Sequence, residues 1–101
     1  FDVPAERCFH GFGAAAAVLD SDLDLVLLAT PPHFRPGQLE AAVARGLHVF
    51  LEKPVAVDAP GVRQVLAAAD AATAQGLSIV AGTQRRHQKG YIETITKLHD
   101  N

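Results

Sequence analysis

Three short apolar runs constrain the fold of this chain more than any other feature of its sequence. They cover residues 25–29, 47–51 and 77–81, and only His48 and Ser78 interrupt them. Each run has the length of a strand and is followed by polar or turn-forming residues. Continuous rather than alternating apolar runs are typical of strands buried on both faces, as in parallel sheets. We therefore expect three parallel strands without a polar face.

Helical patterns flank these runs, over residues 14–19, 36–46, 58–76 and about 90–98. Pro36 suits a first helical turn, Asp58 suits an N-cap, and Gly46 and Gly76 suit helix ends. Strand starts lie roughly 20–30 residues apart, close to the size of a βαβ unit. The sequence therefore predicts an α/β fold: a partial, Rossmann-like, doubly wound parallel sheet of about three strong strands with flanking helices.

Polar residues gather where the three predicted strands end. They are Thr30-Pro31-Pro32-His33 after the first strand, Glu52-Lys53-Pro54 after the second and Gly82-Thr83-Gln84-Arg85-Arg86 after the third. In open α/β sheets, ligands bind outside the carboxyl ends of the strands. We therefore expect a binding site at this edge of the sheet.

Residues 11–16 match the dinucleotide fingerprint G-x-G-x-x-G/A, but their context does not. A genuine pyrophosphate loop follows a buried strand and precedes an acidic residue at the end of the next strand. Residues 4–10 are too polar for a central strand, and the nearby acids precede the strand at residues 25–29 instead of following it. We interpret the match as a glycine turn that leads into an alanine-rich helix.

The segment Glu52-Lys53-Pro54 is the stronger chemical signal. It places an acid and a base at the mouth of the expected crevice, followed by a proline that fixes φ and admits a cis peptide bond. A lysine at this point can hydrogen-bond a substrate hydroxyl and transfer a proton. An exposed Glu-Lys pair at a strand end is an equally good interpretation of these residues taken alone.

Charge and cysteine content exclude several classes of function. With Lys+Arg 9 against Asp+Glu 11, the chain has no basic excess for nucleic acid or a membrane surface. A single cysteine, Cys8, excludes an internal disulfide and a multi-cysteine zinc site. The five histidines show no metal-ligand spacing, so we expect no metal site. From the charge balance we expect no nucleic-acid and no membrane partner.

Four stretches together resemble the Gfo/Idh/MocA family of NAD(P)-dependent oxidoreductases. They are residues 24–33 with the Thr-Pro loop, residues 46–54 with the Glu-Lys-Pro signature, residues 80–86 with a Gly-x-x-x-Arg segment, and Tyr91. The resemblance implies hydride transfer between NAD or NADP and a hydroxyl-bearing carbon of a sugar or cyclitol. Lys89 departs from the pattern, because the family often has proline there.

The resemblance also assigns site residues. Lys53 would be catalytic, at the nicotinamide and the substrate hydroxyl, and Glu52 would contact the nicotinamide ribose. The full set of cofactor-binding positions that it implies is Thr30, Pro31, His33, Glu52, Lys53, Pro54 and Arg86, with Arg85 as the alternative to Arg86.

The family's glycine fingerprint and ribose-binding acid belong to a first βαβ unit that this chain does not show. Methionine is absent and residue 1 is Phe. We therefore expect residues 1–101 to be the C-terminal part of a Rossmann-type domain, without the substrate and dimerisation domain. Alone it would be inactive; the full-length protein would form a homo-oligomer, in the cytoplasm or exported. The alternatives are an NAD-using glycoside hydrolase of the same family and a non-catalytic α/β binding module.

Overall fold

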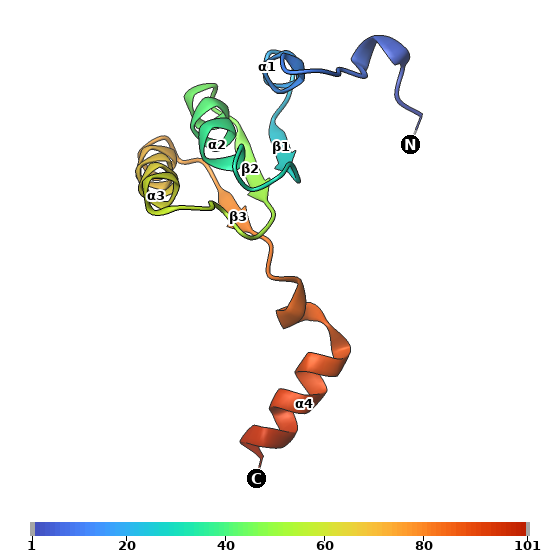
Figure 1. The fold of residues 1–101 in the computed structure, drawn as a ribbon, viewed down its shortest axis with the longest axis vertical. Coiled ribbons are helices and arrows are strands. Elements are labelled where there is room, and N and C mark those ends of the chain that lie inside the picture. Colours follow the sequence, from blue (N-terminus) through green and yellow to red (C-terminus); the bar gives the residue numbers. More distant parts are fainter. Residues whose placement is uncertain (1, 101) are drawn as a thin grey trace.

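The computed structural model describes residues 2–100. A parallel sheet and two helices packed on it form its body, and further helical elements lie before and after them (Figure 1). The elements are, in chain order, η1 (Ala5–Arg7), α1 (Ala14–Leu19), β1 (Leu25–Leu28), α2 (Arg35–Ala44), β2 (His48–Leu51), α3 (Ala59–Ala74), β3 (Ile79–Ala81), η2 (Gln84–His87) and α4 (Lys89–His99).

The three strands form one parallel sheet in the order β1-β2-β3. The register places Leu28 beside Leu51, and Leu51 beside Ala81, so the three strands end level with one another. Helices α2 and α3 are the connections between the strands, and both lie on the same face of the sheet (Figure 1). The predicted α/β fold is confirmed, and each strand lies within its predicted apolar run.

Capping residues explain where α3 begins and where α2 and α3 end. The Asp58 carboxylate accepts a hydrogen bond of 2.7 Å from the Gly61 amide and so caps α3, as its position predicts. Gly46 and Gly76 have φ values of +75° and +70° just beyond the two helices. Only glycine adopts this backbone readily, which is why both helices end there.

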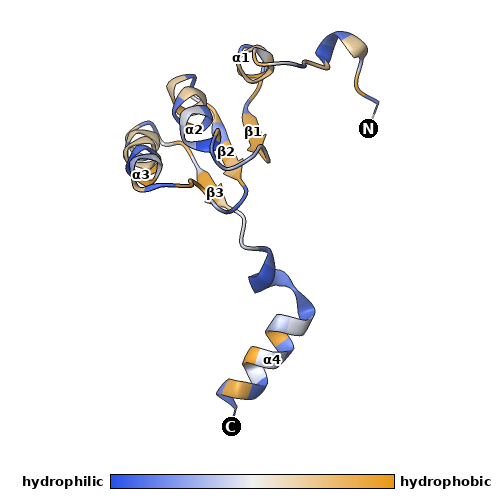
Figure 2. Cartoon of the chain, in the orientation of Figure 1, coloured by the Kyte–Doolittle hydropathy of each residue, from blue (hydrophilic) through white to orange (hydrophobic). Residues whose placement is uncertain are grey.

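The hydrophobic core lies between the sheet and the two helices. Val26, Leu28, Val49 and Leu51 are its buried strand residues. The helices contribute Leu39, Ala42 and Val43 from α2 and Ala68 and Ala72 from α3. Figure 2 shows the apolar colour concentrated along the strands. The small alanines let α3 lie close to α2, so the core is thin but closed on this side.

The expectation that the strands are buried on both faces is wrong for the described residues. Leu25, Leu27 and Val80 point to the other face and are 51%, 67% and 55% exposed. The physical reason is topological. Consecutive parallel strands joined by crossovers of one hand receive both helices on one face. No described element covers the second face, although its side chains are apolar.

The two ends of the chain extend from this body. Before Gly11 the described residues form only the short η1 turn and no strand, which confirms that residues 11–16 are a turn into a helix. At the other end, α4 packs on η2 and projects away from the sheet (Figure 1). In the part of the chain that the structure describes, no helix is both long and apolar enough to cross a membrane.

Candidate functional site at the strand ends

Backbone hydrogen bonds continue past the ends of the strands and bring the predicted loops together. The Glu52 amide donates to the Leu28 carbonyl at 3.0 Å, and the Gly82 amide donates to the Leu51 carbonyl at 2.8 Å. Glu52 therefore lies between the loop after β1 and the loop after β3. The structure brings the start of all three loops to one edge of the sheet, as the parallel arrangement predicts.

The Glu52 carboxylate lies directly against Gly82. A Cβ atom placed on Gly82 would lie 2.9 Å from each of Glu52 Cδ, Oε1 and Oε2, which is closer than real Cβ contacts. Glu52 Oε2 also accepts a bond of 3.2 Å from the Lys53 amide. Gly82 is buried and Glu52 is half-buried. Because Gly82 has no side chain, there is room for the Glu52 carboxylate at this position.

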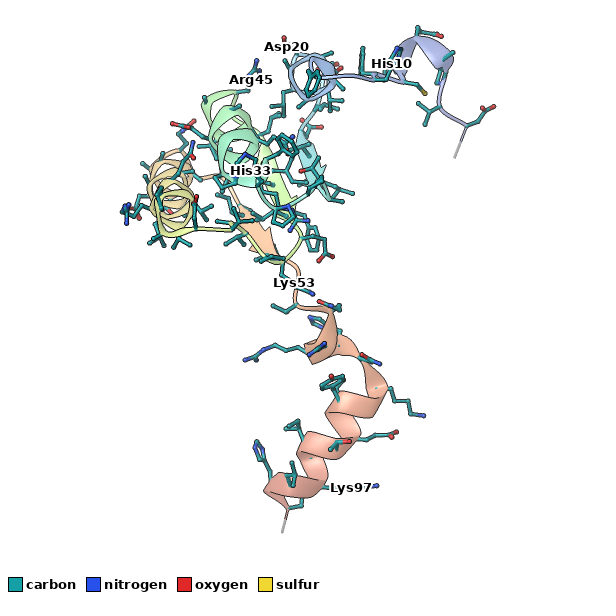
Figure 3. All side chains as sticks on the ribbon, in the orientation of Figure 1. His10, Asp20, His33, Arg45, Lys53 and Lys97 are labelled. Atoms are coloured by element: carbon teal, nitrogen blue, oxygen red, sulfur yellow. The ribbon has the colours of Figure 1, made fainter. Side chains whose placement is uncertain are left out.

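Lys53 and Pro54 follow on the exposed rim of this edge. The Lys53 side chain is exposed and lies at the carboxyl end of the sheet, near the point where the chain leaves for η2 (Figure 3). The peptide bond between Lys53 and Pro54 is cis, the isomer that a proline at this place admits. An exposed ammonium beside a half-buried carboxylate provides one donor and one acceptor for a polar ligand.

The predicted site residues of the loop after β1 lie in different surroundings. The Thr30 hydroxyl donates to Gln38 Oε1 of α2 at 2.5 Å, which ties the loop to that helix. Pro31 is exposed. His33 lies on the side of the loop next to α2 and α3 (Figure 3), where it lines a hollow of about 200 Å³ with Pro36 and Asp58. Whether these residues contact a cofactor stays a prediction.

The third loop folds into η2 and turns its arginines toward α4. Arg85 lies over the Tyr91 ring, with its guanidinium carbon 5.5 Å from the ring centroid. Arg86 and Arg85 together line a hollow against α4 that also includes Tyr91 and Ile95. The structure thus groups Arg86 with α4, and its role at the cofactor stays a prediction.

Sequence reasoning missed Arg35, the first residue of α2. Arg35 is only 5% exposed, and its Nη1 donates to the carbonyl oxygens of Glu52 at 2.7 Å and of Pro54 at 2.6 Å. A signal was present in the sequence, because a cation in the first turn opposes the helix dipole. Such a residue is expected to have a partner elsewhere, and here the partner is the Glu-Lys-Pro loop.

His48 and Cys8 make structural contacts away from the strand-end loops. His48 Nδ1 accepts a bond of 2.9 Å from the Ser78 amide and so joins β2 to the start of β3. Cys8 is exposed, and its thiol donates to the Pro4 carbonyl at 3.5 Å. Within residues 2–100, no group of three or more His, Cys, Asp or Glu side chains could hold a metal ion.

The sequence matches the family described as "Oxidoreductase family, NAD-binding Rossmann fold", the Gfo/Idh/MocA family, over residues 4–81. The chain belongs to this family. The match spans β1, β2 and β3 and includes the Thr-Pro loop and the Glu-Lys-Pro segment, so the resemblance drawn from the sequence is confirmed.

Individual relatives agree with this assignment. An inositol 2-dehydrogenase from Cereibacter sphaeroides is 35% identical over 95 residues, covering 87% of this chain and 28% of the relative. The scyllo-inositol dehydrogenase from Lactobacillus casei, solved with bound NAD(H) and scyllo-inositol, superposes with a TM-score of 0.67 at 25% identity, over 85% of this chain and 25% of that one. A 3-ketoreductase variant from Actinomadura kijaniata, solved with NADP, has the same fold (TM-score 0.71, 24% identity, 84% and 26% covered).

This chain spans only about a quarter of the length of the relatives it matches. Its residues fit one half of the family's dinucleotide. The Glu52 carboxylate accepts a bond from the Lys53 amide and keeps acceptor capacity for hydroxyl donors such as those of a ribose. Residues 11–16 do not fit the pyrophosphate half, because no strand precedes them in the described part of the chain.

Proposed function

We propose that this chain supplies the nicotinamide side of the site in an NAD(P)-dependent oxidoreductase that acts on a hydroxyl-bearing carbon of a sugar or cyclitol. In this proposal the chain is the C-terminal part of a Rossmann-type domain within a longer, homo-oligomeric protein. The observation that carries the proposal is the level edge of the sheet, where the Glu52 carboxylate rests on Gly82 beside the exposed Lys53.

Glu52 and the loop after β1 would bind and orient the cofactor. The carboxylate oxygens of Glu52 would accept hydrogen bonds from the hydroxyls of the nicotinamide ribose. Thr30, Pro31 and His33 would line the cofactor along their loop, with Pro54 behind the Glu-Lys pair and Arg86 on the side of β3. The Thr30 bond to Gln38 supports this arrangement, because it holds the loop against α2.

Lys53 would hold and move the proton. Its amine would accept a hydrogen bond from the substrate hydroxyl and take the proton as the alcohol becomes a ketone. In the reverse direction the ammonium would return that proton to the carbonyl oxygen. When bound, the nicotinamide supplies the hydride acceptor or donor. The exposed position of Lys53 at the rim supports this role, because a substrate can reach its side chain.

The named relatives support a cyclitol as the first substrate to test. One of them is an inositol 2-dehydrogenase, and another was solved with scyllo-inositol. The experiment uses the protein expressed from its complete reading frame, with myo-inositol, scyllo-inositol or a panel of aldoses, and NAD or NADP. Formation of the reduced cofactor is followed by its absorbance.

Lys53→Ala is expected to lower kcat about 10²–10⁴-fold, the range for loss of a general acid or base. Lys89→Ala is the matched control, because Lys89 is exposed and forms an ion pair of 3.6 Å with Glu93 on its own helix. Unchanged turnover in Lys53→Ala would remove the catalytic role of this residue. Release of sugar from a glycoside without net cofactor reduction would favour the glycoside hydrolase.

A further inference from the structure

Arg35 is a buried cation that the proposed chemistry does not use. Its bonding partners are the two carbonyls of Glu52 and Pro54, and the described residues place no carboxylate within ion-pair distance of it. Its Nε is also buried and has no hydrogen-bond partner among those residues. Burial of a charge without an opposite charge is unfavourable, and so is a cation at a helix N-terminus.

The hydrogen bonds that Arg35 donates offset these unfavourable features. One nitrogen, Nη1, donates to the carbonyl oxygen of Glu52, the residue before Lys53, and to that of Pro54, the residue after Lys53. Charge-assisted hydrogen bonds are stronger than neutral ones, and two from one guanidinium also fix the distance between their acceptors. The backbone on both sides of Lys53 is therefore tied to the start of α2, an element anchored in the core.

We propose that Arg35 is a positioning residue: by holding the carbonyls of Glu52 and Pro54, its guanidinium sets the direction in which Lys53 leaves the backbone. The Lys53 side chain is exposed, so packing does not define its orientation. The orientation must then come from the backbone. This inference rests on the proposed function for its effect on turnover. The two hydrogen bonds from Arg35 to the carbonyls of Glu52 and Pro54, which we call the clamp, are a property of the chain itself.

The first test measures the clamp without any activity. Hydrogen exchange of the Glu52 and Lys53 amides is compared between the wild type and Arg35→Met in the protein from the complete reading frame. Both amides are hydrogen-bonded in the structure. We expect exchange at least tenfold faster in Arg35→Met and an intermediate value in Arg35→Lys, which keeps the charge but replaces the guanidinium by an ammonium on a four-carbon chain.

Arg45→Met is the matched control. Arg45 follows the same helix at its other end, is exposed, and pairs with Asp20 at 2.6 Å. Its loss should leave exchange at Glu52 and Lys53 unchanged. Equal exchange in Arg35→Met and Arg45→Met would overturn the inference. If Arg35→Met does not fold, the comparison is made between Arg35→Lys and Arg45→Lys.

The second test is a double-mutant cycle on turnover. Arg35→Met should lower kcat about 10²-fold, the effect of a misplacement near 1 Å, and change KM for the polyol by less than about threefold. In the Lys53→Ala background it should lower kcat no further, because Arg35 acts through Lys53. Additive losses would overturn the inference. If the wild type oxidises no polyol, the proposed function fails, and the exchange experiment alone decides the clamp.

Discussion

Replacement of Gly82 by alanine places a methyl group where the Glu52 carboxylate now lies. The added Cβ would be 2.9 Å from three atoms of that carboxyl group. Ordinary van der Waals contact begins near 3.4 Å, so the carboxylate must move by about half an ångström. The φ angle of Gly82 is not positive, so alanine meets no backbone strain there. The effect of Gly82→Ala therefore falls on the Glu52 side chain.

The expected magnitudes differ for stability and for binding. Overpacking a filled site costs about 1–3 kcal/mol, and the lower end applies here because the Glu52 side chain can rotate. Rotation takes its oxygens away from their present place, so the cofactor should bind about tenfold more weakly, which corresponds to ~1.4 kcal/mol. Gly82→Ala should therefore weaken binding of NAD(P) more clearly than it lowers the free energy of unfolding.

The assay is isothermal titration of NAD and NADP together with urea unfolding, in the protein from its complete reading frame. Gly37→Ala is the control, since a Cβ at Gly37 meets nothing within 4 Å. In a Glu52→Ala background, Gly82→Ala should cost no further stability, because the clashing atoms are gone. The reasoning is refuted if Gly82→Ala binds cofactor as tightly as Gly37→Ala, or if its stability loss persists without the Glu52 carboxyl group.

Three further predictions concern the scaffold, and urea unfolding measures each of them. Leu39 is fully buried between the sheet and the helices, so Leu39→Ala should lower the free energy of unfolding by about 2–5 kcal/mol. Asp58→Ala removes the cap on the Gly61 amide and should cost about 1 kcal/mol, whereas Asp58→Asn should retain most of the stability. Asp20→Asn removes the charge that pairs with Arg45 and should cost less than about 1 kcal/mol, because the side chains of Asp20 and Arg45 are 63% and 37% exposed.

The fold could be predicted because its local signals agree. The apolar runs, the Asp58 cap and the glycines after α2 and α3 each depend on neighbours close in sequence. The edge at which the loops meet followed from parallel pairing alone. Because parallel strands have their carboxyl ends at the same edge of a sheet, Glu52 and Gly82 could be predicted to lie at that edge, although they are 30 positions apart in the sequence.

Two features could not be read from sequence patterns, for physical reasons. The open face of the sheet depends on where the connecting helices lie, and an apolar run looks the same whether one face or both are covered. The role of Arg35 depends on a contact with residues 17 and 19 positions away in sequence. Its only local signal is its unfavourable position at the start of α2.

The strand order of the sheet bears on how the chain forms during synthesis. Each of the three described strands pairs with the next one along the chain, so these pairings need no partner from a distant part of the sequence. Since a ribosome adds about 5–20 residues per second, each strand meets its completed neighbour within on the order of a few seconds. Gly82 follows β3, the last of the three described strands to emerge. The place of the Glu52 carboxylate against Gly82 therefore forms only once β3 lies beside β2, so a carboxylate at this place indicates that these two strands have paired.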